Sequence, residues 1–448
     1  MENPPSLAIV PQPESSPDVK QPNEAEDVHN EAQKASITPY PQDVFGNEEH
    51  AEIRYKVLTW WQCSILMVAE TISLGVLALP RAVASLGLAP ALSVLLGLGA
   101  VATYTGYVIA QLKWKYPHVS SAADAGQLLF GKAGRAVFFW SNMMYLVFIM
   151  ASHLLTFTVA MNTITRHATC SIIFGVVGLV ISCLLAIPRT LERMTWLSFV
   201  SFASIIAAVL TTMIAVGIRN TPPPIKATTE TNLVSGFTAA ANIVFSFSSH
   251  NTFFTIISEL RDPRDFPKSL ALLQSLDMTI YVIAAVVSYC YTGKDVPSPA
   301  LGAAEPLISR IAYGIALPTH STDHHRRSHH GHIACKSIYV RVFAGTDRMH
   351  KRDLVAVGSW VAIALGVWIA AWIIASAIPV FNNLLSLIVS IFASWFSFGL
   401  PGIFWLWMNR GRWFASARKT ALTVLNIFCI CIAIILCGLG LYTSGKAI

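Results

Sequence analysis

Long apolar blocks recur along most of this chain, and they constrain its fold more than any other feature. The hydrocarbon core of a bilayer is about 30 Å thick, so a helix needs about 20 apolar residues to cross it. Residues 57–80 supply such a stretch, and ten further blocks follow. Only 12% of the residues are charged, whereas a soluble protein carries about 25%. The chain is therefore predicted to be an integral membrane protein.

The apolar blocks are predicted to be transmembrane α-helices. Backbone polar groups surrounded by lipid must be satisfied internally, which leaves helices and closed barrels. The blocks lack the period-two alternation of barrel strands, so the expected fold class is an all-α membrane protein. The eleven predicted spans are residues 57–80, 86–112, 135–164, 171–188, 194–217, 235–258, 268–291, 305–343, 355–378, 380–407 and 420–442.

The first part of the chain differs from everything after it. Residues 1–52 contain eight prolines and many acidic residues but no apolar run. Such a segment buries too little apolar surface to fold, and it lacks the basic start and short apolar stretch of a signal peptide. The sequence therefore predicts a disordered cytoplasmic tail over residues 1–52 and a transmembrane domain over residues 53–445.

The positions of lysine and arginine predict the orientation, because cytoplasmic loops are enriched in these residues. If the N-terminus is cytoplasmic, twenty of them fall inside and seven outside. This distribution places the N-terminus in the cytoplasm and, after eleven crossings, the C-terminus outside. The basic residues lie between apolar blocks, so no nucleic-acid partner is expected. The eight cysteines show no paired metal spacing, so no metal or other cofactor is expected.

The eighth block is unusual because a histidine-rich run, residues 320–330, interrupts it. The run contains two arginines and an aspartate, and each charge at mid-membrane costs about 2.5–3.5 kcal/mol. A metal site is one interpretation of such a run. However, if this block did not cross the membrane, every later loop would change sides. The later basic clusters would then no longer lie in the cytoplasm. A histidine codon that is followed by a histidine or arginine codon encodes Ile or Thr when it is read one nucleotide later. A local frame error is therefore our hypothesis, and sequencing the transcript tests it.

The first span contains residues that are typical of an interrupted helix. Glu70 is an acid inside an apolar block, and Ser73, Gly75 and Pro80 follow it. An interruption at mid-membrane exposes backbone amides and the positive N-terminus of a half-helix, which can face an anion. We therefore expect an unwound segment around residues 71–75.

The sixth span carries a second polar cluster at a corresponding position. Three serines, a histidine and an asparagine lie between Phe245 and Phe254, and they are costly at mid-membrane unless they line a cavity. Ordinary hydrogen bonding between helices is the alternative. Spans one to five and six to ten then form two halves of an inverted repeat, each opening with a broken helix, and the eleventh helix is additional. Matching interruptions of this kind indicate a transporter's binding site.

Together, the two interruptions predict a site for an amino acid. Half-helix N-termini would bind its carboxylate, and free carbonyls would bind its ammonium group. The expected partners are therefore an amino acid substrate and the lipid bilayer. The substrate-binding residues predicted from the two segments are Thr71, Ile72, Ser73, Gly75, Phe245, Ser246, Ser248, Ser249 and His250.

Several stretches of the chain resemble the amino acid/auxin permease family, and within it the fungal neutral amino acid permeases. The similar stretches are residues 70–82, which match a Gly-Ala-Gly-Ile-Leu-x-Leu-Pro pattern, residues 245–251 with 258–260, and residues 334–341 with 345–350. The resemblance covers residues 50–445, although Ser73 stands where the family usually has its first glycine. It implies an eleven-helix inverted-repeat transporter with helices one and six unwound. It also implies that helix three faces the substrate, which adds Tyr145 to the site.

The driving ion is predicted to be the proton. Ala69 stands where sodium-coupled relatives carry an asparagine ligand. Desolvation disfavours the charged form of a carboxylate, so an acid near the site can load a proton outside and release it inside. Glu70 is the first candidate for proton coupling, and Glu259, near the cytoplasmic end of span six, is the second. A structural hydrogen bond or ion pair is the alternative for both.

These features predict proton-coupled symport of neutral aliphatic and aromatic amino acids. The expected location is the plasma membrane, with the vacuolar membrane as the alternative. A nutrient-sensing receptor that transports little, and a transport-defective product of the interrupted eighth span, are the alternative functions. No nucleotide-binding loop or catalytic constellation indicates an enzyme. Other polar residues within spans are expected to be satisfied packing or gate residues; they are Asn142, His153, Asp277, Asn382 and Asn383.

Overall fold

The computed structural model describes residues 56, 58–185, 194–218, 225–343 and 354–447. The chain divides into two compact units, residues 1–42 and residues 43–448. All the described helices belong to the second unit. The predicted tail, residues 1–52, lies outside the described residues, so its boundary and its disorder stay predictions.

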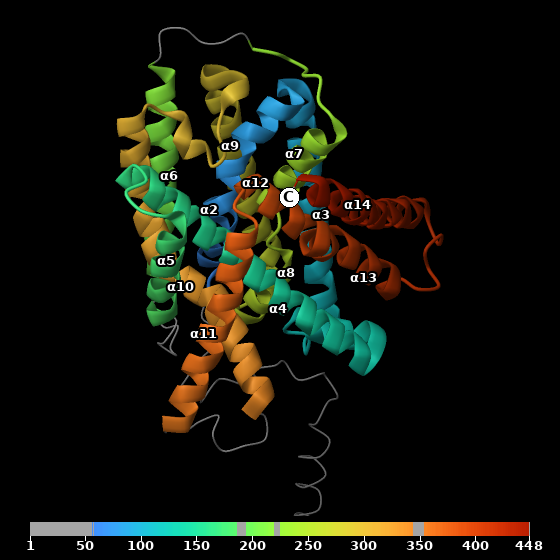
Figure 1. The fold of residues 1–448 in the computed structure, drawn as a ribbon. Coiled ribbons are helices and arrows are strands. Elements are labelled where there is room, and N and C mark those ends of the chain that lie inside the picture. The colour runs from blue at the N-terminus through green and yellow to red at the C-terminus, as the bar shows by residue number, and fades with distance from the viewer. Residues whose placement is uncertain (1–55, 57, 186–193, 219–224, 344–353, 448) are drawn as a thin grey trace, which may run out of the picture. The chain divides into compact units, whose positions relative to one another are not determined.

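The described part of the chain consists of helices joined by non-helical connections (Figure 1). Its only extended pairing is an isolated parallel bridge between Leu58 and Leu260. Each of the eleven predicted spans coincides with a helix or a pair of helices. The helices are α2 (Trp60–Leu86), α3 (Leu88–Lys115), α4 (Ala122–Thr165), α5 (Ser171–Leu185), α6 (Met194–Gly217), α7 (Leu233–Ser246), α8 (His250–Glu259), α9 (Phe266–Thr292), α10 (Pro306–Phe343), α11 (Leu354–Ala377), α12 (Phe381–Ile388), α13 (Leu400–Met408) and α14 (Ala417–Ala447).

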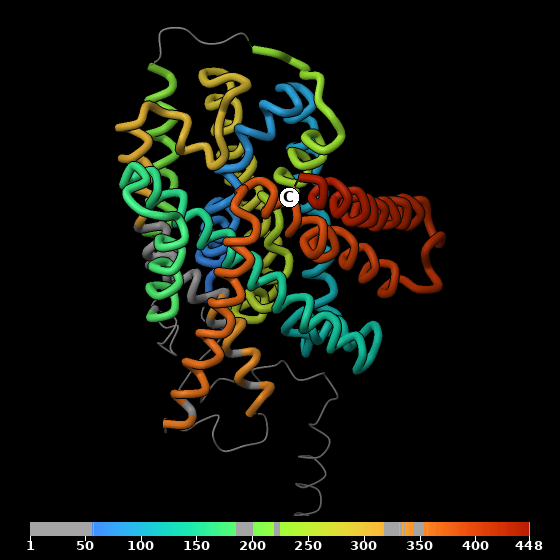
Figure 2. Tube along the Cα trace, viewed as in Figure 1, coloured from blue at the N-terminus to red at the C-terminus, as the bar shows by residue number. Residues whose placement is uncertain are grey.

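Seven helices of the described chain are long and apolar enough to cross a bilayer: α2, α3, α4, α6, α9, α11 and α14. The segment from α12 to α13 is bent by 40° and makes an eighth if the two parts form one span. It contains two π-helical segments, Val389–Ala393 and Trp395–Gly399. After α13 the chain turns back, and α14 packs beside α13 (Figure 2). The all-α membrane fold is thus confirmed, while the count of eleven crossings and the inverted repeat stay predictions.

The eighth predicted span corresponds to α10, whose backbone is helical from Pro306 to Phe343. Its apolar first part, Pro306–Leu317, is shorter than a membrane crossing. α10 packs against α4, α6 and α11, and Gly331 lies close to Met150 of α4 and Trp368 of α11. The side chains of residues 320–330 lie outside the described part of the chain. The metal interpretation and the frame-error hypothesis therefore stay untested.

The predicted interruption of the sixth span is confirmed. α7 ends at Ser246 and α8 begins at His250, so three residues, Phe247 to Ser249, separate two short helices. The amides of Phe247 and Ser248 still bond to the last turn of α7. The break thus gives α8 a separate N-terminal turn, whose first amides have no preceding helical carbonyl.

The predicted interruption of the first span is wrong, because α2 is one helix from Trp60 to Leu86 with Pro80 inside it. Its small polar residues bond to their own helix. The Thr71 hydroxyl lies 3.2 Å from the Met67 carbonyl oxygen and 3.0 Å from that of Val68. Back-bonding of this type satisfies a hydroxyl without breaking the helix. Gly75 allows close packing instead, since a Cβ there would lie 2.9 Å from the Cα of Ser246 on α7.

α9 runs beside α2 in the same direction. Near their starts, the Ser64 hydroxyl donates to the Ser269 carbonyl oxygen at 3.1 Å. Near their ends, the Arg81 guanidinium donates to the Lys294 carbonyl oxygen at 3.0 Å. The middle of α9 therefore lies against the middle of α2, and Asp277 lies beside Thr71.

Candidate functional site

The break between α7 and α8 opens onto a small cavity of ≈ 30 Å³. The residues that line it come from α2, α4, α7 and the break, and they are Glu70, Thr71, Ser73, Leu74, Tyr145, Ile149, His153, Phe245, Ser248 and Ser249. Thr71, Ser73, Tyr145, Phe245, Ser248 and Ser249 were predicted to bind substrate, and Glu70 was predicted to couple protons. The structure thus brings together residues as far apart in the sequence as Glu70 and Ser249.

Tyr145 connects α4 to the break. Its hydroxyl donates to the carbonyl oxygen of Ser248 at 2.7 Å, which gives a break carbonyl a partner that the helix does not supply. The ring of Tyr145 stacks on that of Phe396 with centroids 5.8 Å apart, and it also contacts the ring of Phe392. Both phenylalanines belong to the π-helical segments and were not predicted. In the sequence both lie among apolar residues, so nothing there indicated that they pack against a residue of the cavity.

Glu70 is the acid of the cavity. The Thr252 hydroxyl of α8 lies 3.4 Å from its carboxylate, and that hydroxyl also lies 2.8 Å from the Ser249 carbonyl oxygen. Glu259, the second predicted proton-coupling residue, does not line the cavity. It is the last residue of α8, and its carbonyl oxygen accepts a hydrogen bond from the Leu58 amide at 3.1 Å. The structure therefore separates the two acids along the length of α8.

Four of the predicted substrate residues do not line the cavity. Ile72 is fully buried, and Gly75 packs on Ser246. The Ser246 hydroxyl donates to the Asn242 carbonyl oxygen at 3.2 Å. The Nε2 atom of His250 lies 2.9 Å from the Ala102 carbonyl oxygen of α3. Gly75, Ser246 and His250 therefore take part in contacts between helices around the cavity, and Ile72 belongs to the buried core.

The cavity is too small for an amino acid in this conformation. A water molecule needs about 10–15 Å³ of such space, so ≈ 30 Å³ holds about two waters. The helices around the break must separate before a larger solute enters. The structure thus shows the cavity in a closed state.

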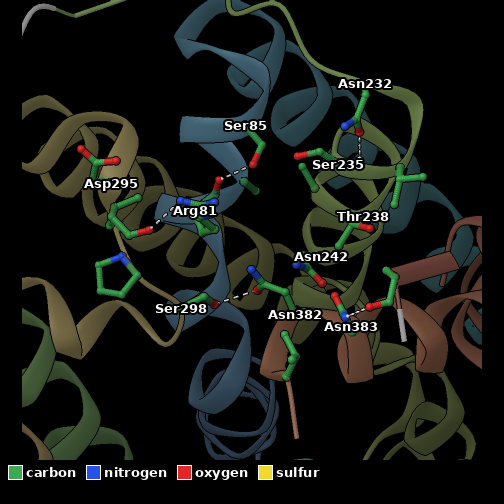
Figure 3. Close-up of a pocket in the computed structure, with 17 residues that line it drawn as sticks. Arg81, Ser85, Asn232, Ser235, Thr238, Asn242, Asp295, Ser298, Asn382 and Asn383 are labelled. Atoms are coloured by element: carbon green, nitrogen blue, oxygen red, sulfur yellow. Dashed lines mark hydrogen bonds between the residues drawn. The ribbon is translucent and has the colours of Figure 1, made fainter. Parts of the chain in front are cut away.

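A second cavity of ≈ 450 Å³ lies nearer the end of α2 and the start of α7 (Figure 3). Arg81 on its wall donates to the carbonyl oxygens of Lys294 and Val296 at 3.0 and 3.3 Å. Asn242 of α7 also lines it, one turn before Phe245 of the first cavity. α7 thus contributes residues to both cavities, and the larger one is a candidate access vestibule.

Asn382 and Asn383 also line this vestibule. The Ser298 hydroxyl donates to Asn382 Oδ1 at 2.7 Å, and Asn383 Nδ2 donates to the Ala447 carbonyl oxygen at 2.7 Å. Both side chains are hydrogen-bonded, as expected for packing or gate residues. Asp277 differs, because neither carboxylate oxygen has a hydrogen-bond partner among the described residues. The Thr71 hydroxyl lies beside this carboxyl group, so the expectation that Asp277 is a satisfied packing or gate residue stays a prediction.

Comparisons with known proteins give the family. The model of the family described as transmembrane amino acid transporter protein matches residues 56–445. The chain is 32% identical over 440 residues to the N amino acid transport system protein of Neurospora crassa, which covers 91% of this chain and 92% of the relative. It is 26% identical over 365 residues to a protein of Gibberella moniliformis named transmembrane transporter, with 79% of this chain and 76% of the relative covered.

A solved structure shares the fold. A transporter of the nucleobase-cation-symport-1 family, in a closed conformation with bromovinylhydantoin bound, superposes with a TM-score of 0.52. The two chains are 13% identical over 92% of this chain and 94% of the other, so the likeness concerns the fold alone. The family match spans nearly the whole transmembrane part, and it confirms the resemblance found in the sequence. The chain therefore belongs to the transmembrane amino acid transporter family.

Proposed function

We propose that this chain is a secondary active transporter that carries neutral aliphatic and aromatic amino acids together with protons. The observation that carries the proposal is the broken span α7–α8, whose break meets Glu70 and Tyr145 at one cavity. A zwitterion suits this arrangement. The N-terminal turn of α8 offers amides and a positive partial charge to a carboxylate, while the end of α7 and the break offer carbonyl oxygens to an ammonium group.

The side-chain pocket supports a preference for neutral substrates. Tyr145, Phe245 and Leu74 supply aromatic and aliphatic surface to the cavity, and Glu70 is its only acid among the described residues. A second charge on the substrate side chain would lose its hydration there without a fixed partner of opposite sign. Leucine and phenylalanine should therefore compete strongly for uptake, and lysine and glutamate weakly.

The experiment that tests the proposal is uptake of labelled phenylalanine in cells that lack their own amino acid permeases. Expression of this chain should produce saturable accumulation, which unlabelled leucine suppresses. Saturable binding without accumulation would instead indicate a receptor. Equal competition by lysine would contradict the neutral pocket.

Proton coupling is proposed to use Glu70 first and Glu259 second. Glu70 lines the cavity and is half-buried, so a proton on it would alter the charge next to the substrate ammonium. Glu259 lies at the end of α8 beside the start of α2, a position that suits proton release toward the cytoplasm. Uptake should increase as the outside pH falls from about 7 to 5 and should collapse with a protonophore, without a requirement for sodium.

The variant Glu70→Gln tests the first of these roles. The amide keeps the shape of the carboxylate but cannot ionise. Accumulation against a gradient should be lost, whereas exchange of internal for external amino acid should persist because exchange does not require the proton to cycle. Retained pH-dependent accumulation in Glu70→Gln would show that Glu70 is not the proton carrier.

A further inference from the structure

A buried acid on α9 lies outside the cavity and has no role in the function proposed above. Asp277 is fully buried, and neither of its carboxylate oxygens has a hydrogen-bond partner among the described residues. An ionised carboxylate removed from water needs hydrogen bonds or an opposite charge. Among the described residues no cation lies next to Asp277, and the only hydroxyl groups close to its carboxyl belong to Thr71 and Tyr281. The conformation therefore fits the neutral, protonated acid.

The helices packed against α9 bring no described cation to this level of the membrane. α9 packs against α2, α3 and α6, and α6 contains no titratable side chain. On α2, Arg81 reaches the far end of α9 at Lys294, and Glu70 faces the cavity. Cys63 lies near Ser269, at the start of α9.

The titratable groups of α3 also lie away from Asp277. Gly99 of α3 faces the side chain of Met278, the next residue of α9. Tyr104 receives a hydrogen bond from Asn426 of α14, Tyr107 is exposed, and the two lysines of α3 lie in its last turn. The remaining titratable neighbour is Tyr281, one turn farther along α9.

Two hydroxyl groups lie beside the Asp277 carboxyl, and both are engaged elsewhere. Thr71 Oγ1 lies next to Asp277, and it also lies 3.2 and 3.0 Å from the carbonyl oxygens of Met67 and Val68 on its own helix, to either of which it can donate its one proton. The Tyr281 hydroxyl also lies close to both residues, but it donates to the Ser246 carbonyl oxygen at 2.9 Å. Ser246 is the last residue of α7, directly before the break, and Thr71 lines the cavity.

Loss of the proton from Asp277 would change these contacts. An ionised carboxylate is a stronger acceptor than a backbone carbonyl, so it would draw the protons of Thr71 and Tyr281 toward itself. The Tyr281 hydroxyl would then leave the Ser246 carbonyl at the end of α7, and the Thr71 hydroxyl would turn away from the carbonyls of α2. The charge state of Asp277 would thus alter hydrogen bonds of two helices that line the cavity, α2 and α7.

We propose that Asp277 is a proton-binding site that communicates with the substrate cavity through Thr71 and Tyr281. The inference rests on the proposed function, since it assigns an additional site to proton-coupled transport. One proton is bound and released in each cycle: the carboxylate takes the proton when it is accessible from outside and releases the same proton when it is accessible from inside. Tyr281 and Thr71 act as positioning residues, because they respond to the proton without carrying it.

The test uses the purified full-length protein in liposomes, with labelled phenylalanine and a pH-sensitive dye inside. Asp277→Asn keeps the shape of the neutral acid but cannot ionise. It should retain exchange of phenylalanine, yet lose substrate-driven proton entry and the rise of uptake from about pH 7 to about pH 5. Glu305→Gln, at an exposed acid before α10, is the matched control and should keep both properties.

The outcomes separate the inference from the function on which it rests. If the wild-type protein carries no phenylalanine or moves no protons with it, the proposed function fails and the inference fails with it. If the wild-type protein moves protons and Asp277→Asn moves them equally well, the inference alone is overturned.

A second variant decides the matter if Asp277→Asn does not fold. Tyr281→Phe keeps the ring and removes the hydroxyl that would stabilise ionised Asp277. The proton should then be held more tightly, so the pH of half-maximal uptake should move upward while substrate-driven proton entry persists. An unchanged pH profile in Tyr281→Phe would contradict the proposed communication.

Discussion

At the scale of single residues, Gly75 controls how closely α2 and α7 pack. A side chain there would meet the backbone of Ser246 at 2.9 Å, and overpacking of this kind costs about 1–3 kcal/mol. We predict that Gly75→Leu reaches the membrane but loses uptake of labelled phenylalanine by roughly tenfold or more, because the strain falls next to the break. Gly366→Leu on α11 is the control, since no atom lies within 4 Å of a Cβ there. Normal uptake kinetics in Gly75→Leu would count against the site.

Tyr145 offers a milder change at the same cavity. Tyr145→Phe removes the hydroxyl that donates to Ser248 but keeps the ring that stacks on Phe396. A hydrogen bond of this kind contributes about 0.5–1.5 kcal/mol. The half-saturating phenylalanine concentration should therefore rise by roughly three- to tenfold while the amount of protein in the membrane stays constant. Tyr442→Phe, at an exposed tyrosine of α14, should leave uptake unaltered.

The state of a single polar residue was the hardest property to predict. The sequence showed that Asp277 lies inside an apolar block, but not whether a partner on another helix would satisfy it. That depends on the rotation of α9 against α2 and α3, which residue order alone does not specify. His250 illustrates the same limit, because its contact with the Ala102 carbonyl directs it to α3 and not to the cavity.

At the scale of elements, the helices themselves were predictable because lipid leaves the backbone few alternatives. The break in span six was also predictable, since a cluster of polar residues at mid-membrane needs a cavity. The same reasoning failed for α2. Its serine and threonine form hydrogen bonds within the helix, and its glycine allows close packing on α7. A continuous helix of this kind and an interrupted helix therefore contain the same types of residue.

The N-terminal turn of α8 leads to a prediction about substrates. If its amides bind the substrate carboxylate, removing that negative charge should weaken binding strongly, because helix N-termini favour anions. Phenylalanine methyl ester keeps the ring and the ammonium group but lacks the charge. It should compete for uptake of labelled phenylalanine at least roughly tenfold more weakly than phenylalanine itself. Equal competition would mean that the carboxylate binds elsewhere.

At the scale of the whole molecule, the distribution of basic residues gives a prediction about its termini. Twenty lysines and arginines fall on one side and seven on the other if the chain crosses eleven times. An epitope added after Ile448 should therefore be labelled by antibody in intact cells, and an epitope before Met1 only after permeabilisation. Labelling of both termini under the same condition would indicate an even number of crossings. The segment that contains α10 would then be the first to re-examine, because its apolar part is short.

The ≈ 30 Å³ cavity has a consequence for inhibitors of this protein. A competitive inhibitor of amino acid size cannot enter the conformation described, so it must wait until the helices around the break separate. Its binding rate would then reach a plateau at high inhibitor concentration, set by the frequency of opening and not by diffusion. Compounds that fit the open form would show slow onset and long residence, because the cavity must reopen before they leave. Screening by rapid assays would overlook such compounds, whereas preincubation with the transporter would reveal them.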